Sequence, residues 1–383
     1  MPFYQSRRDA FSCDATCYGR YTSLRSFLSL LGSFLCGRLS DRYGRAPLLH
    51  LGVLATLLGL ALSWAAQDVR GLYLAMVPGA LLQNNFAVVK ALFADYYSAP
   101  SEARGLDGEV AGLVGKLGMS VGISFMLGPM IGGMFVSTFS AGALVAAVLT
   151  SLSWACVIMI PPPPNPKGPQ NQTPKGGHTF LDLTPLRSPG PRVVLLLRML
   201  MSLAFHTFMT PWTPSLKERF DFGPKQHGTF MSFVGLVYAL SQGFAAKAVV
   251  RAVGRSDLIL VSCSVFLSLG RVVAMGTDRL EVVYGCFFLI IISLGVTNTV
   301  ISAALNGLAP PEKIGGLIGL VGSFESLAGM VGPMVGGKVF ELGGKEGTLA
   351  VVCACYVGVA GTAWVGWRKW VEGGMREGKV KTT

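Results

Sequence analysis

The residues whose types and spacing could support chemistry begin with a charged stretch between two apolar runs. Residues 37–45 read Gly-Arg-Leu-Ser-Asp-Arg-Tyr-Gly-Arg. Asp41 can accept hydrogen bonds from a neighbouring helix N-terminus, while Arg42 and Arg45 can reach carboxylates at the end of an adjacent helix, with Asp95 as the expected partner. We expect a conformational latch formed by Gly37, Asp41, Arg42, Gly44, Arg45 and Asp95. The alternative is a basic loop that only fixes topology, although such a loop needs neither the glycines nor Asp41.

Polar side chains inside the apolar runs form a second group of candidates. A charge at the centre of a bilayer costs about 2.5 to 3.5 kcal/mol on insertion scales, so polar residues there are functional candidates by default. Several share a helix face, because residues three, four or seven apart lie on one side of a helix. These candidates are Gln83, Asn84, Lys90, Arg198, Ser202, His206 and Asn298. For Lys90 and Arg198 the alternative is a side chain that extends to the membrane surface, and for His206 a structural histidine.

Glu325 lies midway along another apolar run and has no basic residue within one helical turn of its own sequence. Burial in such a place favours the protonated carboxyl, because a low dielectric disfavours charge. This behaviour suits a proton carrier. The alternative is a neutral carboxyl that is hydrogen-bonded to a neighbour. Lys116 and Arg271 are further candidates for which the sequence indicates no partner.

These side chains need elements to position them, and the composition indicates helices in a membrane. Of the 383 residues, 51% are hydrophobic and only 14% are charged. A chain immersed in lipid must satisfy its backbone hydrogen bonds internally, so apolar runs near the ~20 residues that span a bilayer predict helices. We predict an all-α, multi-pass integral membrane protein with eleven spans, at residues 22–37, 47–66, 72–96, 110–136, 139–160, 193–213, 228–250, 257–275, 281–305, 315–340 and 348–367.

The charge distribution predicts the orientation and the order of domains. The net charge of +12 requires no nucleic-acid partner, because cytoplasmic loops of membrane proteins gather lysine and arginine. The same bias places the C-terminus in the cytoplasm. The expected order is an external segment at 1–21, an N-terminal bundle at 22–160, a proline-rich cytoplasmic linker at 161–192, a C-terminal bundle at 193–367 and a basic cytoplasmic tail at 368–383.

The two predicted bundles repeat each other in sequence. Tyr-Gly-Arg at 43–45 returns as Val-Gly-Arg at 253–255, and Gly-Pro-Met-Ile-Gly-Gly at 128–133 returns as Gly-Pro-Met-Val-Gly-Gly at 332–337. Repeats of this kind build pseudo-symmetric bundles with a binding site where they meet. The span at 193–213 has no counterpart in the first half, so we expect one helix of a twelve-helix plan to be missing, through a truncated gene model or an isoform.

The stretch at 37–45 resembles the signature of the major facilitator superfamily between its second and third helices, with only Ser40 departing from the pattern. Gly115 and residues 128–133 resemble the antiporter motif of that family, with Ser124 where the fuller pattern has glycine. The closest similarity is to tetracycline-resistance-like proton antiporters. Small residues let helices approach closely, so we expect a helix-packing motif, with ordinary packing as the alternative. Its members are Gly115, Gly128, Pro129, Gly132 and Gly133.

The resemblance implies both a fold and a function. It implies two pseudo-symmetric helical bundles and secondary active transport of a small organic solute by alternating access, with proton antiport as one form of coupling. In the family, the first, fourth, seventh and tenth helices line the substrate cavity. This assigns the cavity to the seven polar candidates named above, from Gln83 to Asn298. The helix in the eleventh place, which carries Glu325, usually supports the cavity in the family, so the proton-coupling role of Glu325 rests on its expected burial alone. The latch would stabilise the outward-facing state.

Other classes of function have less support in the sequence. No stretch resembles a phosphate-binding loop, and the four histidines have no spacing typical of a metal or catalytic site. We therefore expect no enzyme activity, no cofactor and no metal. The alternative from another class is a truncated membrane protein that binds or regulates without transporting. The expected partners are a small-molecule substrate, membrane lipid and protons, and the chain is expected to be a monomer.

Overall fold

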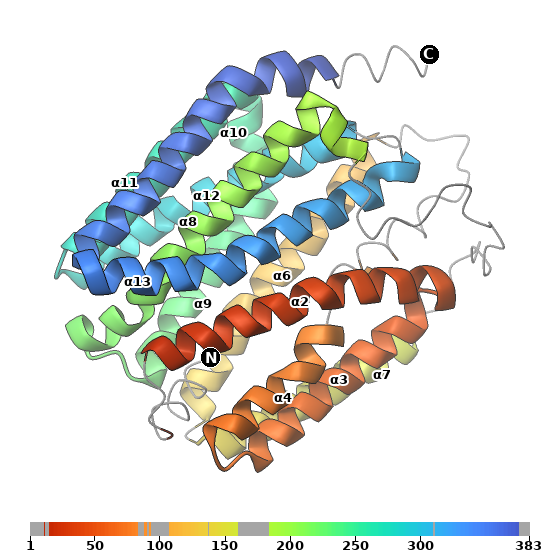
Figure 1. Ribbon diagram of the computed structural model, residues 1–383, viewed down its shortest axis with the longest axis vertical. Coiled ribbons are helices and arrows are strands. Elements are labelled where there is room, and N and C mark those ends of the chain that lie inside the picture. The colour runs from red at the N-terminus through yellow and green to blue at the C-terminus, as the bar shows by residue number, and fades with distance from the viewer. Residues whose placement is uncertain are drawn as a thin grey trace. The chain divides into compact units, whose positions relative to one another are not determined.

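The structure is a computed structural model, shown in Figure 1. It describes residues 11, 15–82, 88–89, 92, 107–136, 138–159, 184–308 and 311–374. Within these ranges the chain forms helices joined by turns and contains no strand. The prediction of an all-α protein is confirmed. A helix occupies at least part of each of the predicted spans.

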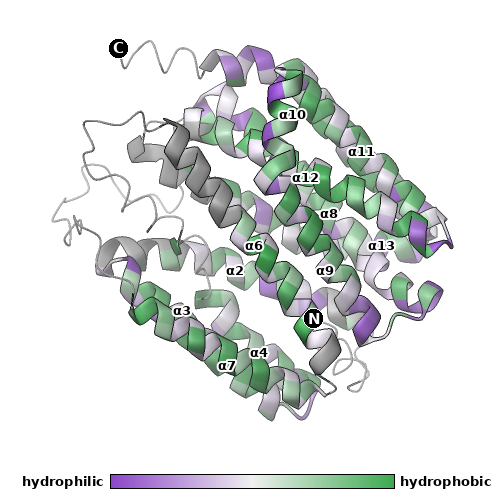
Figure 2. Ribbon diagram, turned by 180° about the vertical axis from the view of Figure 1, so that it is seen from behind, coloured by the Kyte–Doolittle hydropathy of each residue, from purple (hydrophilic) through white to green (hydrophobic). Residues whose placement is uncertain are grey.

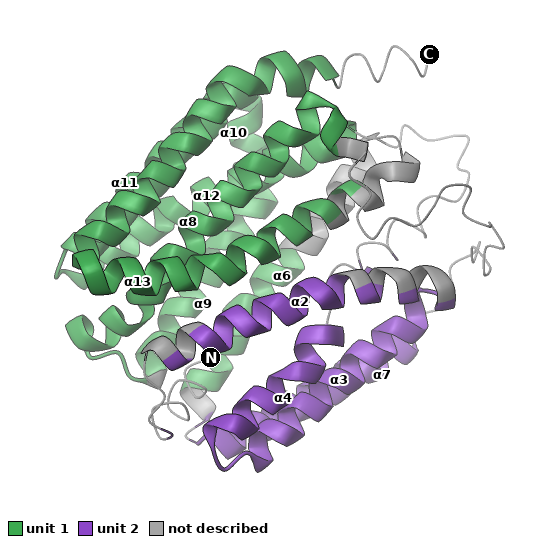
Figure 3. Ribbon diagram, viewed as in Figure 1, with its two compact units in different colours: residues 1–2, 111–135, 183–383 green, residues 3–110, 136–182 purple. Residues whose placement is uncertain are grey.

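The chain divides into two compact units, which Figure 3 distinguishes by colour. Unit 1 consists of residues 1–2, 111–135 and 183–383, and unit 2 of residues 3–110 and 136–182. This division differs from the sequence halves in one respect, because most of α6 (Asp107–Phe135) groups with the later helices. The reason is close packing within unit 1. A Cβ added to Gly228 of α9 would lie 2.6 Å from the backbone oxygen of Pro129 on α6.

Unit 2 contains α2 (Ala15–Tyr43), α3 (Arg45–Ala65), α4 (Val69–Leu82) and α7 (Phe139–Ile158). Several polar contacts join these helices. The Tyr73 hydroxyl donates to the backbone oxygen of Cys17 at 3.0 Å, and the Trp154 indole nitrogen donates to Nδ1 of His50 at 2.9 Å. The large side chains Leu144, Val148 and Leu152 of α7 are exposed, as expected for a helix that faces lipid.

The connection between α2 and α3 is shorter than the sequence predicted. The apolar pattern placed a loop at 38–46, but α2 continues to Tyr43 and α3 begins at Arg45. Gly44 alone makes the turn, at φ 92°, a conformation that favours glycine. Its repeat counterpart Gly254 likewise ends a helix at φ 65°. Hydropathy ended the span at the first charged residue, whereas a polar segment can continue a helix beyond it.

Unit 1 contains most of α6 and all of the elements from η1 onward. They are η1 (Thr184–Arg187), α8 (Pro189–Phe220), α9 (Pro224–Leu240), η2 (Ser241–Ala245), α10 (Ala246–Val253), α11 (Ser256–Gly276), α12 (Leu280–Leu308), α13 (Pro311–Gly366) and η3 (Trp367–Glu372). Helix α13 joins the last two predicted spans across a kink at Gly344, where φ is 58° and ψ is −152°. The short segment η2 is a π-helical turn between α9 and α10.

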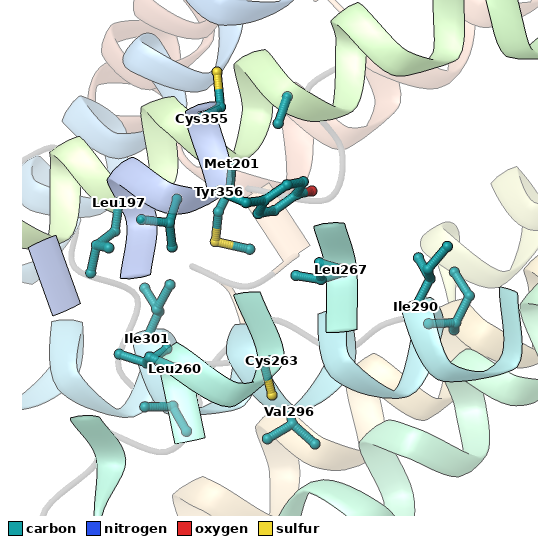
Figure 4. Packing of buried hydrophobic residues seen from close by; sticks show 14 of the residues in the cluster. Leu197, Met201, Leu260, Cys263, Leu267, Ile290, Val296, Ile301, Cys355 and Tyr356 are labelled. Carbon is teal, nitrogen blue, oxygen red and sulfur yellow. The ribbon is translucent and has the colours of Figure 1, made fainter. Parts of the chain in front are cut away.

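The core of unit 1 is a large apolar cluster. Figure 4 shows Leu197, Leu267, Ile301 and Tyr356 among the side chains that fill it, each from a different helix. These residues come from α8, α11, α12 and α13, in that order. The cluster holds these helices together and so fixes where their few polar side chains lie.

The helices are long and apolar enough for a membrane. Among the described residues, seven helical segments could cross a bilayer by length and composition. They are Arg45–Ala65, Phe139–Ile158, Pro189–Phe220, Lys225–Val253, Ser256–Gly276, Leu280–Leu305 and Leu320–Glu372. Figure 2 shows apolar residues along the middle of the helices and hydrophilic residues mainly towards their ends. This pattern fits helices that cross a bilayer and end in water.

Candidate functional site

Arg198 is the centre of a polar cluster inside unit 1. Its Nη1 atom donates to Oδ1 of Asn298 on α12 at 2.6 Å and lies 3.6 Å from Oε1 of Glu325 on α13. The side chain of Arg198 is 16% exposed, whereas that of Glu325 is 41% exposed. Ser202, one turn along α8, donates from its hydroxyl to the backbone oxygen of Glu325 at 3.3 Å. Three helices thus bring one guanidinium, one carboxylate, one amide and one hydroxyl together.

The close packing of α8 against α13 positions this cluster. A Cβ on Gly332 would lie 2.6 Å from Cβ of His206, and one on Gly336 would lie 2.8 Å from the backbone oxygen of Thr207. Neither position tolerates a side chain without movement of the neighbouring helix. The second copy of the Gly-Pro repeat therefore forms the contact that lets Arg198 reach Glu325, two turns before Gly332.

A second set of polar contacts connects α12 with the π-helical turn η2. The Gln242 amide donates to the backbone oxygen of Gly295 at 3.3 Å, and the Thr299 hydroxyl donates to Oε1 of Gln242 at the same distance. The Ser241 hydroxyl donates to the backbone oxygen of Ile292 at 3.1 Å. Asn298 and Thr299 are neighbours on α12, so one helix presents polar groups in two directions.

Gln242 is the residue that sequence reasoning missed. The signal that could have found it is an amide side chain within the long apolar segment Lys225–Val253. A π-helical turn is a further indication, because such turns are frequent at functional sites.

The structure unites four of the predicted site residues and leaves others apart. Glu325 lies beside Arg198, Ser202 and Asn298. The sequence predicted proton coupling for Glu325 and solute binding for the other three. The sequence gave Glu325 no basic neighbour on its own helix, and Arg198 reaches it from another one. The Glu325 side chain is 41% exposed and lies 3.6 Å from the Arg198 guanidinium, so it is less buried than the sequence predicted, and its role in proton coupling stays a prediction. The His206 ring has no hydrogen-bond partner among the described residues and packs near Gly332 instead.

Other predicted site residues lie outside what the structure describes. This applies to Gln83, Asn84, Lys90 and Asp95, and to the side chains of Asp41 and Arg42. The latch therefore stays a prediction, with Gly44 as its described turn.

The packing motif on α6 behaves differently from its prediction. No described atom lies within 4 Å of a Cβ built on Gly128 or Gly132. The close approach depends instead on Gly122 of α6 and on Gly228 and Gly235 of α9, where an added Cβ would meet backbone atoms of the other helix. Pro129 and Gly133 do face this contact, through Gly228. A helix pair does pack closely here, but the partner helix supplies two of the glycines.

Comparisons with known proteins agree with the fold and the motifs. The sequence profile of the Major Facilitator Superfamily matches residues 1–333, and again residues 221–372. Human "Solute carrier family 67 member A1" is 27% identical over 360 residues, covering 88% of this chain and 80% of the relative. "Tetracycline resistance protein, class E" from Escherichia coli is 26% identical over 328 residues, covering 83% of this chain and 77% of the relative.

A solved structure shares the fold. The crystal structure of the human organic anion transporter MFSD10 (TETRAN) matches with a TM-score of 0.72 at 18% identity, covering 93% of this chain and 87% of that one. The profile match over most of the chain, together with this fold, shows that the protein belongs to the Major Facilitator Superfamily of membrane transporters.

Proposed function

We propose that this protein is a secondary transporter that moves a small organic solute across a membrane by alternating access. The observation that carries the proposal is the Arg198, Asn298 and Glu325 cluster inside a largely apolar bundle. Charged groups in membrane helices are costly and mark solute or ion pathways. A purely structural bundle would gain more from apolar packing at these positions.

The cluster divides into a solute-binding part and a proton-binding part. Arg198, Ser202 and Asn298 supply the donors and acceptors that would hold a solute, and Gln242 with Thr299 extends this polar surface. Glu325 is the proposed proton carrier, because it is the carboxylate in the cluster. The resemblance to tetracycline-resistance-like proteins favours proton antiport. Gln83, Asn84 and Lys90 stay predicted solute contacts.

The sequence adds two further parts to the proposal. The hairpin with Asp41, Arg42, Arg45 and Asp95 would act as a latch that stabilises the outward-facing state. Asp41→Asn should then reduce transport, and unchanged transport would contradict the latch. The basic tail after residue 367 would face the cytoplasm, which protease protection of a C-terminal tag in sealed vesicles can test.

The test of the transport proposal is solute uptake by proteoliposomes under an imposed pH gradient. Purified full-length protein would be screened with radiolabelled anionic, cationic and neutral organic solutes. We expect uptake of at least one solute that collapses when the gradient is dissipated. Glu325→Gln should abolish the response to the gradient, whereas Glu341→Gln, an exposed carboxylate on the same helix, should preserve it. No uptake of any solute by folded protein would overturn the proposal.

A further inference from the structure

We infer that the solute is an organic anion, and that its carboxylate takes the place of Glu325 on the guanidinium of Arg198. This inference rests on the proposed transport function and specifies its substrate class. The relatives carry names that refer to unlike cargoes, so the argument uses only the site itself.

The first observation is the unused hydrogen-bonding capacity of Arg198. A guanidinium has five N–H donors in a planar fork that matches a carboxylate. Its Nη1 donates to Asn298 at 2.6 Å, but the Glu325 oxygen lies 3.6 Å from the same atom, too far for a hydrogen bond. Among the described residues its buried Nε has no hydrogen-bond partner. Glu325 thus lies beside Arg198 without a hydrogen bond to it, so the guanidinium retains donor capacity that an oxyanion in place of Glu325 could use.

The second observation is the charge balance around the cluster. On α8 the titratable groups near it are Arg198 and His206, on α9 Tyr238 lies close enough to act electrostatically on Arg198, and on α13 there is Glu325. Helix α12 presents the neutral Asn298 and Thr299. Arg271 of α11 is held elsewhere, between the rings of Phe208 and Tyr356.

This balance determines the sign of the charge that the solute carries. With Glu325 ionised, the cluster holds one positive and one negative charge. When Glu325 takes up a proton, the mostly buried guanidinium is left without a counter-charge, which is unfavourable in a low dielectric. An organic anion restores neutrality, whereas a cation would add a second positive charge beside Arg198.

The third observation is the difference in exposure between the two ionic partners. The Glu325 side chain is 41% exposed and that of Arg198 is 16% exposed. The carboxylate is therefore the partner that can turn away, while Asn298 keeps hold of the guanidinium. The exchange moves one proton onto a Glu325 oxygen and forms or breaks no other covalent bond.

The exchange also fixes the direction of coupling. The anion binds best when Glu325 carries a proton, so proton and anion are loaded together and released together. An anion bound in this way would move in the same direction as the proton, in contrast to the antiport that the family resemblance favours.

Binding of matched probes tests the inference. Purified full-length protein in detergent would be tested by equilibrium dialysis with radiolabelled aromatic and aliphatic monocarboxylates, each beside its neutral amide and its amine. We expect the carboxylates to bind best, and more tightly at acidic than at neutral pH. Arg198→Gln should weaken carboxylate binding by about 30-fold or more, since it removes the mostly buried guanidinium that would pair with the carboxylate of the solute. Arg192→Gln, an exposed arginine at the start of the same helix, is the matched control and should bind normally.

Two variants separate the exchange from other titrations. Glu325→Gln mimics the protonated carboxyl, so it should bind carboxylates tightly at both pH values. His206→Gln should keep the pH dependence of the unmodified protein. A Glu325→Gln variant with an unchanged pH profile, or an Arg198→Gln variant with unchanged affinity, would overturn the inference.

The uptake assay distinguishes failure of the inference from failure of the transport proposal. Accumulation of carboxylates driven by an acidic exterior supports the inference. If proteoliposomes accumulate only amines or neutral solutes, transport stands and the anion assignment is wrong. If folded protein accumulates no solute of any class, the transport proposal itself fails.

Discussion

Two arginines in unit 1 show how the same side chain can be held in a membrane helix in two different ways. Arg198 on α8 faces polar groups of two other helices, Asn298 and Glu325. Arg271 on α11 is only 3% exposed, donates to the backbone oxygen of Leu267 on its own helix at 2.8 Å and lies over two aromatic rings. The rings of Phe208 and Tyr356 have their centroids 5.4 and 5.0 Å from its guanidinium carbon.

The comparison of the two arginines shows which feature indicates a solute-binding site. Among the described residues, neither arginine has a hydrogen-bond partner for its buried Nε, so an unpaired donor does not by itself distinguish them. The partners do. Aromatic faces and a helix carbonyl stabilise Arg271 and cannot be exchanged for a solute. The carboxylate beside Arg198 is partly exposed and can be replaced. We therefore propose that Arg198 binds the solute and that Arg271 stabilises the bundle.

The largest expected effect is on transport. Arg198→Leu should lower gradient-driven uptake by about 30-fold or more, because it removes the charge that holds Glu325 and the solute. Arg271→Leu should leave uptake per folded molecule within about twofold of the unmodified protein, since its partners are structural. Uptake would be normalised to the monodisperse fraction from size-exclusion chromatography. Equal losses in both variants would remove the distinction between the two arginines.

For stability we expect a smaller effect, and here the substitution of Arg271 should cost more than that of Arg198. Arg271→Lys keeps the charge but loses the planar stacking on two rings, which should destabilise the protein by about 2 kcal/mol. Arg198→Lys should cost less than about 1 kcal/mol, because its partly exposed ion pair contributes little. Thermal unfolding in detergent, followed by fluorescence-detected size exclusion, measures both variants. A larger loss at Arg198 would show that its cluster holds the helices together.

The sequence predicted the fold far better than it predicted which side chains contact one another. Apolar runs and the Gly-Pro repeat lead directly to an all-α chain of repeated bundles, because lipid allows little else. Arg198 and Glu325 were both singled out, but in separate roles, since no pattern reveals that residues on α8 and α13 lie 3.6 Å apart. Arg271 had no predicted partner because its neighbours are rings and a carbonyl, which a search for charged residues does not find.

The glycines show the same limit of sequence-based prediction for helix packing. The motif at 128–133 lies on a helix that packs closely against α9, but an added Cβ on Gly128 or Gly132 would meet no described atom of another helix within 4 Å. The close contacts at Gly228 and Gly235 depend on the rotation of α9 about its axis, which composition does not determine. In the second copy Gly332 and Gly336 do make the contact, so two nearly identical motifs pack differently.

The smallest expected effect is on stability, and it concerns the hydroxyl and the ring of the Tyr356 side chain. Its hydroxyl is hydrogen-bonded to Arg271, and its ring supplies one of the aromatic faces. Tyr356→Phe removes only the hydroxyl and should cost about 1 kcal/mol, as for a single buried hydrogen bond. Tyr356→Leu also removes the aromatic face and should cost about 2 kcal/mol more, from the cation–π contact and lost packing.

The comparison of these two variants shows what holds Arg271. If thermal unfolding shifts little in Tyr356→Phe and strongly in Tyr356→Leu, the ring stabilises the guanidinium. Equal shifts would mean that the hydroxyl is the main partner. In that case Arg271 would resemble Arg198 more closely, since a hydroxyl, like a carboxylate, is a polar group that a solute could replace. Tyr356→Phe should leave uptake unchanged, and a loss of uptake in this variant would bring Arg271 into the solute pathway.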